Sequence, residues 1–546
     1  MGRMQTVAIV GAGPAGLVAA KVLLVDGFDV IVFEKNRTLG GIWSFEGSYY
    51  NLHTQQPGGT IEFSDLYDGE GKIDVFSTAS IEYFYLEYAS WEHVYEYLCR
   101  YARKFDLISR IRLRTRVISI SKTNLHDAEE SWSVKVERTT DVSSSTETFK
   151  FDFVVVANGL FSYYRVPTFR GQEKFSGSIM HANDIKRREQ LINKNILVIG
   201  GSKSAIDMAV NVATLARHCD MIFRRIHLIL PVKILRGHLP LRHLWCRFNC
   251  FLADLYPLAP HSRLFQLAHQ YFKYILVAIR KKIAADLAVS NGPDLYKDGI
   301  FKPQYGSKDG LVSFPVQPIF AELKREDRIR GHIGSIEEII DSNSVRLNTG
   351  KIFSPVDMII CSTGHYIHFP FFSDADARTM GLPHGTSTDL DLYRRIVPIN
   401  VPKIAFVGYN SSSRAWMIDE VASHWVSDYF KGVQLLPSRE EMQKEIEIIR
   451  DFVRSQYGTT APHIRFTWLE PLEIYLNDMK LPLQRANNWW SENFGVYRPN
   501  RFKTLHEERR ARDSGLPFPY RFYFSFLHTV LILIAVLLGI FFRFFY

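Results

Sequence analysis

The sequence predicts an α/β fold with two parallel, doubly wound sheets and a hydrophobic helix at the C-terminus. Two observations predict the sheets: a buried-strand pattern runs into a glycine turn and a helical pattern at residues 6–26, and the same succession starts again at residue 195. The third observation is an uncharged apolar stretch at 522–542. At 546 residues, 46% of them hydrophobic and 23% charged, the chain is long enough for two or three packed domains.

A glycine-rich turn joins the first strand, at 6–10, to its helix. Glycines there permit a tight turn and let the backbone approach a pyrophosphate at the positive helix N-terminus. Glu34 ends the next strand, 29–33, where a carboxylate can hold ribose hydroxyls. This unit predicts a Rossmann-like domain that binds a dinucleotide. The expected contacts, besides Glu34, are Gly11, Gly13, Ala15, Gly16 and Lys35.

A second glycine pair follows at Gly40-Gly41, and it precedes Ile42 and Trp43. Such a pair lets the chain pass close beneath a bound adenosine or flavin. The whole run from residue 7 to 43 resembles the FAD-binding half of a flavoprotein that holds two dinucleotides. We therefore expect Gly41, Ile42 and Trp43 to contribute to an FAD site.

The second strand–turn–helix unit begins with a strand at 195–199, and its fingerprint carries Ser202 where a glycine is usual. The following strand, 221–223, ends in Arg224-Arg225 rather than in an acid. A guanidinium there would pair with a 2′-phosphate that a carboxylate would repel, which favours NADPH over NADH. The expected contacts are Gly200, Ser202, Lys203, Ser204, Ala205, Arg224 and Arg225.

Between the two units lies a run that begins Phe175-Ser-Gly177 and continues through His181 to Ile185. It resembles the FxGxxxH motif of the class B flavin monooxygenases. Asn158-Gly159 and Thr363-Gly364 resemble the two interdomain linkers of these enzymes. Over roughly residues 5–430 the chain is similar to a flavin-containing monooxygenase of the N- and S-oxygenating kind. In that family the motif histidine looks more like a linker element than a catalytic base.

Two positions depart from the family pattern. The motif closes on Ile185 rather than on Tyr or Phe, or on the Trp typical of Baeyer–Villiger enzymes. The stretch with Thr54 and Gln55 stands where many relatives carry a Thr-Asn pair, whose asparagine is thought to lie by the flavin C4a position. Gln55 is therefore the candidate catalytic amide, and Thr54, Thr363 and Gly364 are expected to contact a cofactor. Glu420 falls in a helix that resembles the one completing the FAD site, or it is an ordinary solvated carboxylate.

The resemblance implies an NADPH-dependent FAD enzyme. It would insert one oxygen atom from O₂ into a nucleophilic N or S centre of a small, lipophilic substrate, through a flavin C4a-hydroperoxide. The alternatives are a Baeyer–Villiger monooxygenase and a degenerate flavoprotein NADPH oxidase that releases H₂O₂. A disulfide reductase would need a Cys-x-x-Cys pair, which the sequence lacks.

The expected domain organisation is a discontinuous FAD-binding domain interrupted by an NADPH-binding domain. A hydrophobic insert in the second domain would cap the substrate pocket, dip into a membrane interface, or form core. A polar hairpin is expected at 123–148. The predicted ranges are 1–165 with 331–435 for FAD, 166–330 for NADPH, 226–290 for the insert, and 436–520 for the C-terminal region.

The uncharged stretch at 522–542 would reach about 30 Å as a helix, enough to span a bilayer core. Basic residues precede it, so the catalytic domains should face the cytosol, with the endoplasmic reticulum suggested by the family. A buried or interfacial helix is the alternative. The net charge of +9 is dispersed, which disfavours nucleic acid, and the five cysteines suggest neither a disulfide framework nor a metal site. The oligomeric state is left open.

Overall fold

The fold was analysed in a computed structural model. Its main described ranges are 3–66, 87–139, 144–226, 228–234, 239–248, 317–383, 390–457 and 469–518, with short fragments between 257 and 315. The predicted helix at 522–542 and most of the insert 226–290 lie outside the described residues. Within the described ranges, no helix combines the length and apolar character needed to cross a bilayer.

The first sheet has five strands, and all of its pairings are parallel. Across the sheet the strands are β22 (Ile404–Phe406), β7 (Phe153–Val156), β1 (Thr6–Val10), β2 (Asp29–Phe33) and β3 (Ile111–Arg112). Val10, the last residue of β1, aligns with Phe33 of β2 and with Val156 of β7. The carboxyl ends of these strands therefore meet at one edge. The chain passes from β1 to β2 on one side of this edge, whereas β7 and β22 lie on the other side of β1.

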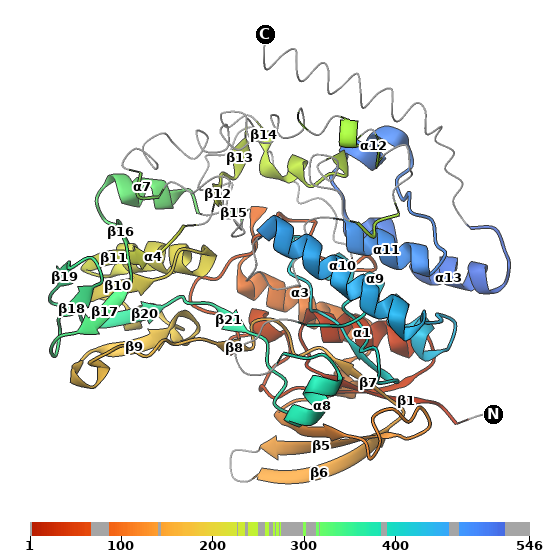
Figure 1. Cartoon of the computed structure of the whole chain (residues 1–546). Helices are drawn as coiled ribbons and strands as arrows, with labels where there is room; N and C mark the ends of the chain where they lie inside the picture. The colour runs from red at the N-terminus through yellow and green to blue at the C-terminus, as the bar shows by residue number, and fades with distance from the viewer. Residues whose placement is uncertain are drawn as a thin grey trace.

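Helices cover this first sheet and form the core with it (Figure 1). They are α1 (Pro14–Val25), α3 (Trp91–Lys104) and α9 (Ala415–Phe430). α1 is mostly apolar, α9 buries nearly all of its side chains, polar and charged ones included, and the two helices pack closely against each other. α3 instead buries one stripe, Val94, Tyr97, Leu98 and Tyr101, at the spacing of an amphipathic helix.

The second sheet is also five-stranded and parallel. Its strands are β16 (Arg330–Ile333), β11 (His218–Phe223), β10 (Asn195–Ile199), β20 (Met358–Cys361) and β9 (Ser178–His181), with α4 (Lys203–Leu215) and α7 (Ile319–Arg325) packed together beside them. Figure 1 shows this sheet on the side of the molecule away from α1. The strands predicted at 6–10, 29–33 and 195–199 are thus confirmed.

The predicted return to the first domain at residue 331 is wrong. β16 pairs with β11, and β20 pairs with β10 through Ile199 and Cys361, so the chain stays in the second sheet through Cys361. β20 falls within 331–435, the range predicted for the FAD-binding domain. An apolar strand buried on both faces fits either parallel sheet equally well, and its sequence pattern carries no information on the partner. The other predicted domain boundaries stay predictions.

Three small antiparallel units complete the two halves. β4 (Thr115–Ser121), β5 (Trp132–Thr139) and β6 (Ser144–Phe151) form one sheet, in which β5 and β6 pair along their whole length near the predicted polar hairpin. β17 (Ile336–Ile339), β18 (Val345–Leu347) and β19 (Ile352–Phe353) lie beside the second sheet. β8 (Tyr163–Tyr164) pairs with β21 (His365–Tyr366) between the two halves, where Figure 1 shows them linking left to right.

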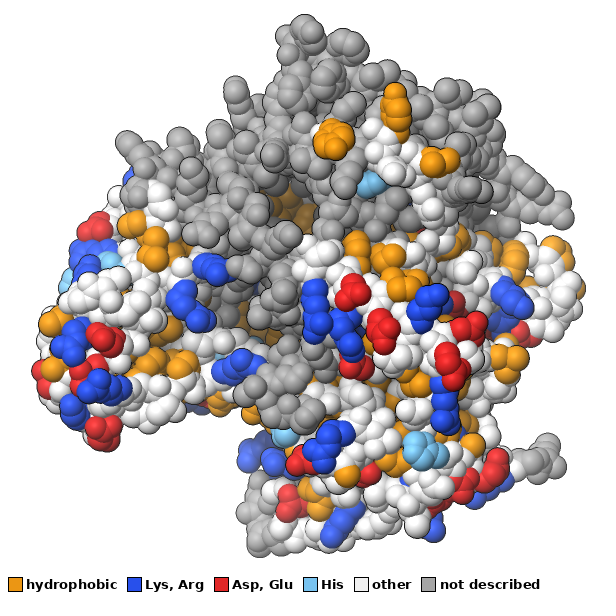
Figure 2. All heavy atoms as spheres, in the orientation of Figure 1, with side chains coloured by type: hydrophobic (Ala, Val, Ile, Leu, Met, Phe, Trp, Pro, Cys, Tyr) orange, Lys and Arg blue, Asp and Glu red, His pale blue; other side chains and the backbone are white. Residues whose placement is uncertain are grey.

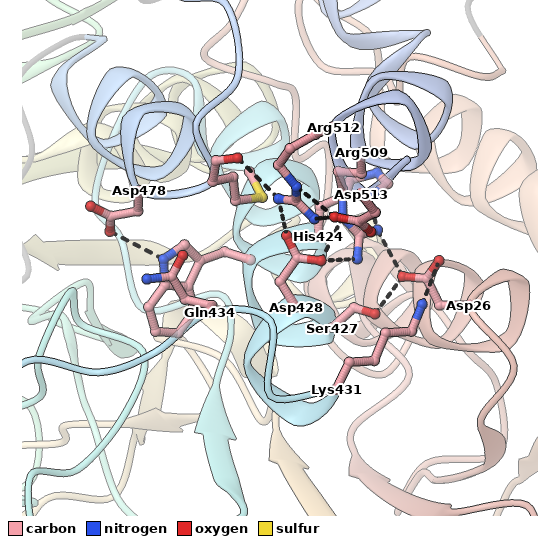
Figure 3. Close-up of polar contacts among 12 residues, drawn as sticks. Asp26, His424, Ser427, Asp428, Lys431, Gln434, Asp478, Arg509, Arg512 and Asp513 are labelled. Atoms are coloured by element: carbon pink, nitrogen blue, oxygen red, sulfur yellow. Dashed lines mark hydrogen bonds and ion pairs between the residues drawn. The ribbon is translucent and has the colours of Figure 1, made fainter. Parts of the chain in front are cut away.

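The C-terminal region packs on the first domain through buried charges. Its helices are α10 (Arg439–Tyr457), α11 (Glu470–Asp478), α12 (Trp489–Phe494) and α13 (Leu505–Asp513). Figure 3 shows Arg509 of α13 between Asp428 of α9 and Asp26, which follows α1. The Arg509 Nη1 donates to Asp26 at 2.7 Å, and its Nε donates to Asp428 at 3.0 Å. This cluster joins α13 to α9 and to the end of α1.

Part of the insert packs against this C-terminal region. Leu241 and Trp245 are buried in a small cluster, and the Trp245 carbonyl accepts from the Tyr497 amide at 2.6 Å. The Arg247 Nε donates to Glu492 at 2.9 Å. The core interpretation therefore fits Leu241 and Trp245, and the membrane-facing and pocket-capping roles of the insert stay predictions.

Candidate active site

The glycine turn after β1 is shaped by close backbone contacts. Gly11 has a φ of +105°, and a Cβ on it would lie 2.6 Å from the Ala157 carbonyl oxygen. A Cβ on Gly16 would lie 1.9 Å from the Gly11 carbonyl oxygen. Only glycine fits at either position, so the turn is as tight as the sequence motif predicts. The structure thereby presents the start of α1 at the carboxyl edge of the first sheet.

Gly13 and Gly41 face each other across this turn. A Cβ on Gly41 would lie 3.1 Å from the Gly13 Cα, so side chains would fill the space between the two segments. Gly13 caps α1 without a side-chain hydrogen bond, and the first turn of α1 contains no acidic residue. Ile42 and Trp43 continue from Gly41, with Trp43 buried. The result is a backbone cradle with free positive helix-dipole character, suited to a diphosphate.

Glu34 lies beside the cradle and is almost fully buried. Its carboxylate accepts the Ala12 amide at 2.8 Å and the Asn36 amide at 2.9 Å. Burial raises the pKa of the Glu34 carboxyl, while these two N–H groups oppose the rise. Each oxygen keeps a lone pair for a further donor, as ribose hydroxyls would be. Lys35, next in the chain, is exposed, and its Nζ lies 5.3 Å from the centre of the Tyr163 ring.

The end of β22 closes the same edge, in the segment that precedes the helix of Glu420. A Cβ on Gly408 would lie 2.8 Å from the Ala15 Cβ, so Gly408 packs directly on the glycine turn. The Asn410 Nδ2 donates to Asp419 at 2.6 Å. Burial raises the pKa of Asp419 to about 7. The signal available in the sequence was the apolar strand followed by Val407-Gly408, which repeats the strand–glycine pattern of β1.

The second fingerprint shows the same construction with one difference. Gly200 has a φ of +139°, and a Cβ on it would lie 2.5 Å from the Ser362 carbonyl oxygen and 3.1 Å from the Ala205 Cβ. Ser202 caps α4 without a side-chain hydrogen bond, and the first turn of α4 holds no acid. The Ser202 hydroxyl and the adjacent Ser204 are thus placed at a positive helix end. Serine in place of the usual glycine leaves the backbone turn intact.

Lys203, which was predicted to contact the cofactor, is not an exposed side chain that points into solvent. It is buried, and its Nζ forms an ion pair with Asp207 one turn further along α4. Arg224 and Arg225 are exposed and follow directly on β11, which pairs with β10. The Arg225 carbonyl backs the glycine turn, because a Cβ on Gly201 would lie 2.2 Å from it. Arg224 and Arg225 therefore follow the carboxyl end of β11, at the same edge of the second sheet as the start of α4.

The candidate catalytic amide lies in an irregular stretch beside residues 87–90. The Thr54 amide donates to the Ala89 carbonyl at 2.9 Å, and the Thr54 hydroxyl donates to the Gln56 carbonyl at 2.9 Å. Thr54 is buried, whereas Gln55 is exposed. The backbone is thus fixed on both sides of Gln55, while its amide can reach a ligand.

The FxGxxxH motif lies between the two halves and is held by tight packing. A Cβ on Gly177 would lie 2.4 Å from the Asp357 carbonyl oxygen, so this glycine lets β9 begin beside β20. Phe175 packs on the cluster beneath the second sheet. Ile185 is fully buried in the core of the second domain, where an aliphatic side chain satisfies the packing.

His181 ends β9 and packs among the linker residues. Its ring stacks on Tyr164 at 4.3 Å and meets the His365 ring edge-on at 5.1 Å. Its Nδ1 accepts the Asn183 amide at 3.1 Å. Burial lowers the pKa of His181 to about 4, so the ring is neutral at physiological pH. This geometry is that of a linker element between the two halves.

The two predicted linkers contact each other. The Thr363 hydroxyl donates to the Arg165 carbonyl, and the Arg165 amide donates to the Gly364 carbonyl at 3.0 Å. Asn158, next to Gly159, donates from its Nδ2 to the His368 carbonyl at 3.0 Å. The sequence pattern had marked these residues, and the structure brings them together between the sheets.

Glu420 is not a solvated carboxylate. It is buried in α9, and its Oε2 accepts the Ser64 amide at 3.0 Å. Burial raises the pKa of Glu420 to about 8. The solvated interpretation is therefore wrong, because α9 buries nearly every side chain it carries.

The two fingerprints suit two dinucleotides, since each offers a glycine cradle and a helix whose first turn carries no acidic residue. Across the described residues, no cluster of three His, Cys, Asp or Glu side chains could hold a metal ion. Basic and acidic side chains alternate over the face shown in Figure 2, so the net charge of +9 is not gathered there.

Comparisons with known proteins agree with this geometry. Residues 4–274 and 328–479 match the model of a family described as flavin-binding monooxygenase-like. The FAD-dependent monooxygenase resA of Aspergillus sclerotiorum is 25% identical over 94% of this chain and 99% of its own length. Flavin-containing monooxygenase 5 of Oryctolagus cuniculus is 26% identical over 86% of this chain and 81% of its own length.

Among solved structures, the NADP⁺-bound cyclohexanone monooxygenase of Rhodococcus sp. Phi1 shares the fold. Its TM-score is 0.61 at 17% identity, and the match covers 87% of this chain and 97% of that one. The family match spans well over half of the chain and confirms the resemblance seen in the sequence. The chain belongs to the flavin-binding monooxygenase-like family and is an FAD-containing monooxygenase.

Proposed function

We propose that this enzyme uses NADPH and O₂ to oxygenate a nucleophilic nitrogen or sulfur centre in a small, lipophilic substrate. The observation that carries the proposal is a pair of glycine cradles, one on each parallel sheet. The two linkers between the sheets contact each other, and His181 of the FxGxxxH motif packs on His365 beside them. One cradle would hold FAD and the other NADPH. An enzyme with a single dinucleotide site would need only one of them.

The first cradle would bind FAD through backbone and carboxylate. The amides at the start of α1 would bind the diphosphate, and the space between Gly13 and Gly41 admits the chain of phosphates without a side-chain clash. Glu34 would accept ribose hydroxyls with its remaining lone pairs. When bound, FAD supplies the hydride acceptance and the O₂ chemistry, for which no protein nucleophile is required.

The second cradle would bind NADPH. The start of α4, with Ser202 and Ser204, would bind its diphosphate. Arg224 and Arg225 would pair with the 2′-phosphate that distinguishes NADPH from NADH. Supporting this assignment, a relative in structure was solved with NADP⁺.

Neutral His181 would take no part in proton transfer, because its pKa of about 4 leaves it unprotonated at neutral pH. It would keep the two linkers in register through its stacked neighbours. Gln55, exposed on a fixed backbone, is the residue whose amide would lie beside the reacting groups.

Two other outcomes compete with N- or S-oxygenation. The fold is shared with a cyclohexanone monooxygenase, so a Baeyer–Villiger reaction on a ketone is the second candidate. Ile185, which replaces the Trp typical of that group, counts against it. A third outcome is an NADPH oxidase that releases H₂O₂.

We also propose that residues 522–542 anchor the enzyme to a membrane, with the catalytic domains in the cytosol and the endoplasmic reticulum as the site. The apolar sequence and the basic residues before it support this. Alkaline extraction of membranes from cells that express the full chain, compared with a chain ending at residue 518, tests the anchor. An anchored protein stays in the pellet only when it is full-length.

The function is tested with the full chain, purified in detergent and loaded with FAD. The flavin is reduced anaerobically with NADPH or NADH, and O₂ is then admitted with a thioether, a tertiary amine or a cyclic ketone. We expect faster reduction by NADPH and formation of a sulfoxide or N-oxide. A lactone would support the Baeyer–Villiger alternative, and H₂O₂ equal to the NADPH consumed, without any product, would support the oxidase.

A further inference from the structure

A loop of the first domain is joined to helix α4 of the second by one buried and two partly buried hydrogen bonds. The Tyr49 hydroxyl donates to the Asp207 Oδ2 at 2.6 Å. The Asn51 Nδ2 donates to the Asn211 Oδ1 at 2.9 Å, and the Asn211 Nδ2 donates to the Tyr50 carbonyl at 3.0 Å. Asp207 and Asn211 are one turn apart, so a single face of α4 receives the loop.

Asp207 also holds the start of the same helix. Its carboxylate forms an ion pair with Lys203, the first residue of α4, and both side chains are buried. One carboxylate therefore has two partners from two parts of the fold. Tyr49 comes from the loop that continues to the candidate amide Gln55, and Lys203 comes from the turn that would bind a diphosphate.

This shared carboxylate is costly to disturb. A buried charge that loses one partner keeps its desolvation penalty, so both partners are held firmly in place. His53, between Tyr49 and Gln55, is buried as well, and its Nδ1 lies 2.9 Å from the Asn51 carbonyl oxygen. The loop is thus held in place from Tyr49 to Thr54, and its hydrogen bonds to the second domain run to Asp207 and Asn211 of α4.

We propose that Asp207 is a positioning residue: through Tyr49 and Lys203 it sets the placement of the dinucleotide-binding helix α4 relative to the loop that carries Gln55. This inference rests on the proposed function, because it concerns hydride transfer between cofactors held by the two halves. Asp207 would touch neither cofactor in this role. Small displacements of a hydride donor from its acceptor slow transfer strongly, so the connection controls the reduction rate.

The test compares Tyr49→Phe with a matched control, Tyr50→Phe. Both changes remove one phenol hydroxyl from the same loop. The Tyr50 hydrogen bonds to the second domain use its backbone, which accepts from Asn211 and donates to the Ile185 carbonyl at 2.7 Å. Phenylalanine keeps both bonds and the apolar ring that packs on the second-domain core. Only Tyr49→Phe removes the hydrogen bond to Asp207.

Two quantities are measured on the FAD-loaded full chain. The first is the limiting rate of anaerobic flavin reduction at saturating NADPH, by stopped-flow absorbance. The second is the dissociation constant of NADP⁺, by titration calorimetry. We expect Tyr49→Phe to lower the limiting rate about tenfold and to change the dissociation constant less than about threefold. We expect Tyr50→Phe to leave both within about twofold of wild type.

The limiting rate separates positioning from lost stability. A variant that is merely less stable yields fewer active molecules, but those molecules still react with the wild-type first-order rate. Asn51→Ser, which breaks the second bridge without exposing a charge, gives an independent variant and should also lower the rate. Equal limiting rates for Tyr49→Phe and Tyr50→Phe would overturn the inference alone, and a wild-type flavin that NADPH fails to reduce would overturn the proposed function with it.

Discussion

Replacing Arg509 with methionine removes the central cation of the buried cluster in Figure 3 while keeping a side chain of similar length. Arg509 pairs with Asp428 and with Asp26, and all three are almost fully buried. Burial raises the pKa of Asp26, but Arg509 and its other partners outweigh this and hold it below the usual value. Without Arg509, two buried carboxylates lose a partner.

The expected cost follows from what remains. Breaking a buried ion pair costs about 3–5 kcal/mol, because it leaves an uncompensated charge. Asp428 keeps Arg512 at 2.7 Å and Asp26 keeps Lys431 at 3.3 Å, so neither carboxylate is left without a cation. We therefore expect the lower end, about 3 kcal/mol less free energy of unfolding for Arg509→Met.

The assay is urea unfolding followed by tryptophan fluorescence, and the control is Arg510→Met. Arg510 is exposed on the same helix, α13, so its replacement should change the free energy of unfolding by less than about 0.5 kcal/mol. The reasoning is refuted if the two variants unfold at the same urea concentration with the same slope. That result would mean that the ion pairs of Arg509 contribute nothing measurable to the free energy of unfolding.

Four further outcomes follow from the site. Burial raises the pKa of Glu420 from 4.5 to about 8. The stability that protonated Glu420 contributes is therefore fully present below pH 4.5 and is lost as the pH rises through 8. Above pH 8, Glu420→Gln should have a higher melting temperature than the wild type. Burial lowers the pKa of His181 from 6.5 to about 4, so the free energy of unfolding should decrease as the pH falls from 6.5 to 4. Denaturation curves of His181→Gln should show a smaller decrease over the same pH range. Arg224→Ser should raise the KM for NADPH about tenfold and leave that for NADH unchanged, as steady-state kinetics would show. Gly41→Ala, with its Cβ 3.1 Å from the facing glycine, should lose FAD on gel filtration, whereas Gly432→Ala, also at positive φ but with open space around it, should retain it.

The sequence predicted those parts of the fold that short-range patterns determine. The strands at 6–10 and 195–199 combine an apolar run with a glycine turn, and the strand at 29–33 is an apolar run that leads into Glu34. Each was found at its predicted residues. The family resemblance was confirmed for the same reason, because its motifs are local. The placement of the predicted cofactor contacts at the strand ends follows from these turns.

Long-range partners could not be predicted in this way. β20, at 358–361, pairs with β10 in the second sheet, and nothing in its four residues indicates which sheet it joins. The bond from Tyr49 to Asp207 joins residues 158 positions apart. The one local signal was the helical spacing of Lys203 and Asp207, which suits an ion pair but does not reveal the tyrosine.

The most direct test of the central claim follows the oxygen atoms. The FAD-loaded full chain is given NADPH, a thioether and O₂ labelled with heavy oxygen, and the product is analysed by mass spectrometry. The account predicts a sulfoxide that carries one labelled oxygen atom, with one NADPH consumed per sulfoxide formed. Unlabelled product, or labelled H₂O₂ as the sole product of NADPH oxidation, would contradict it.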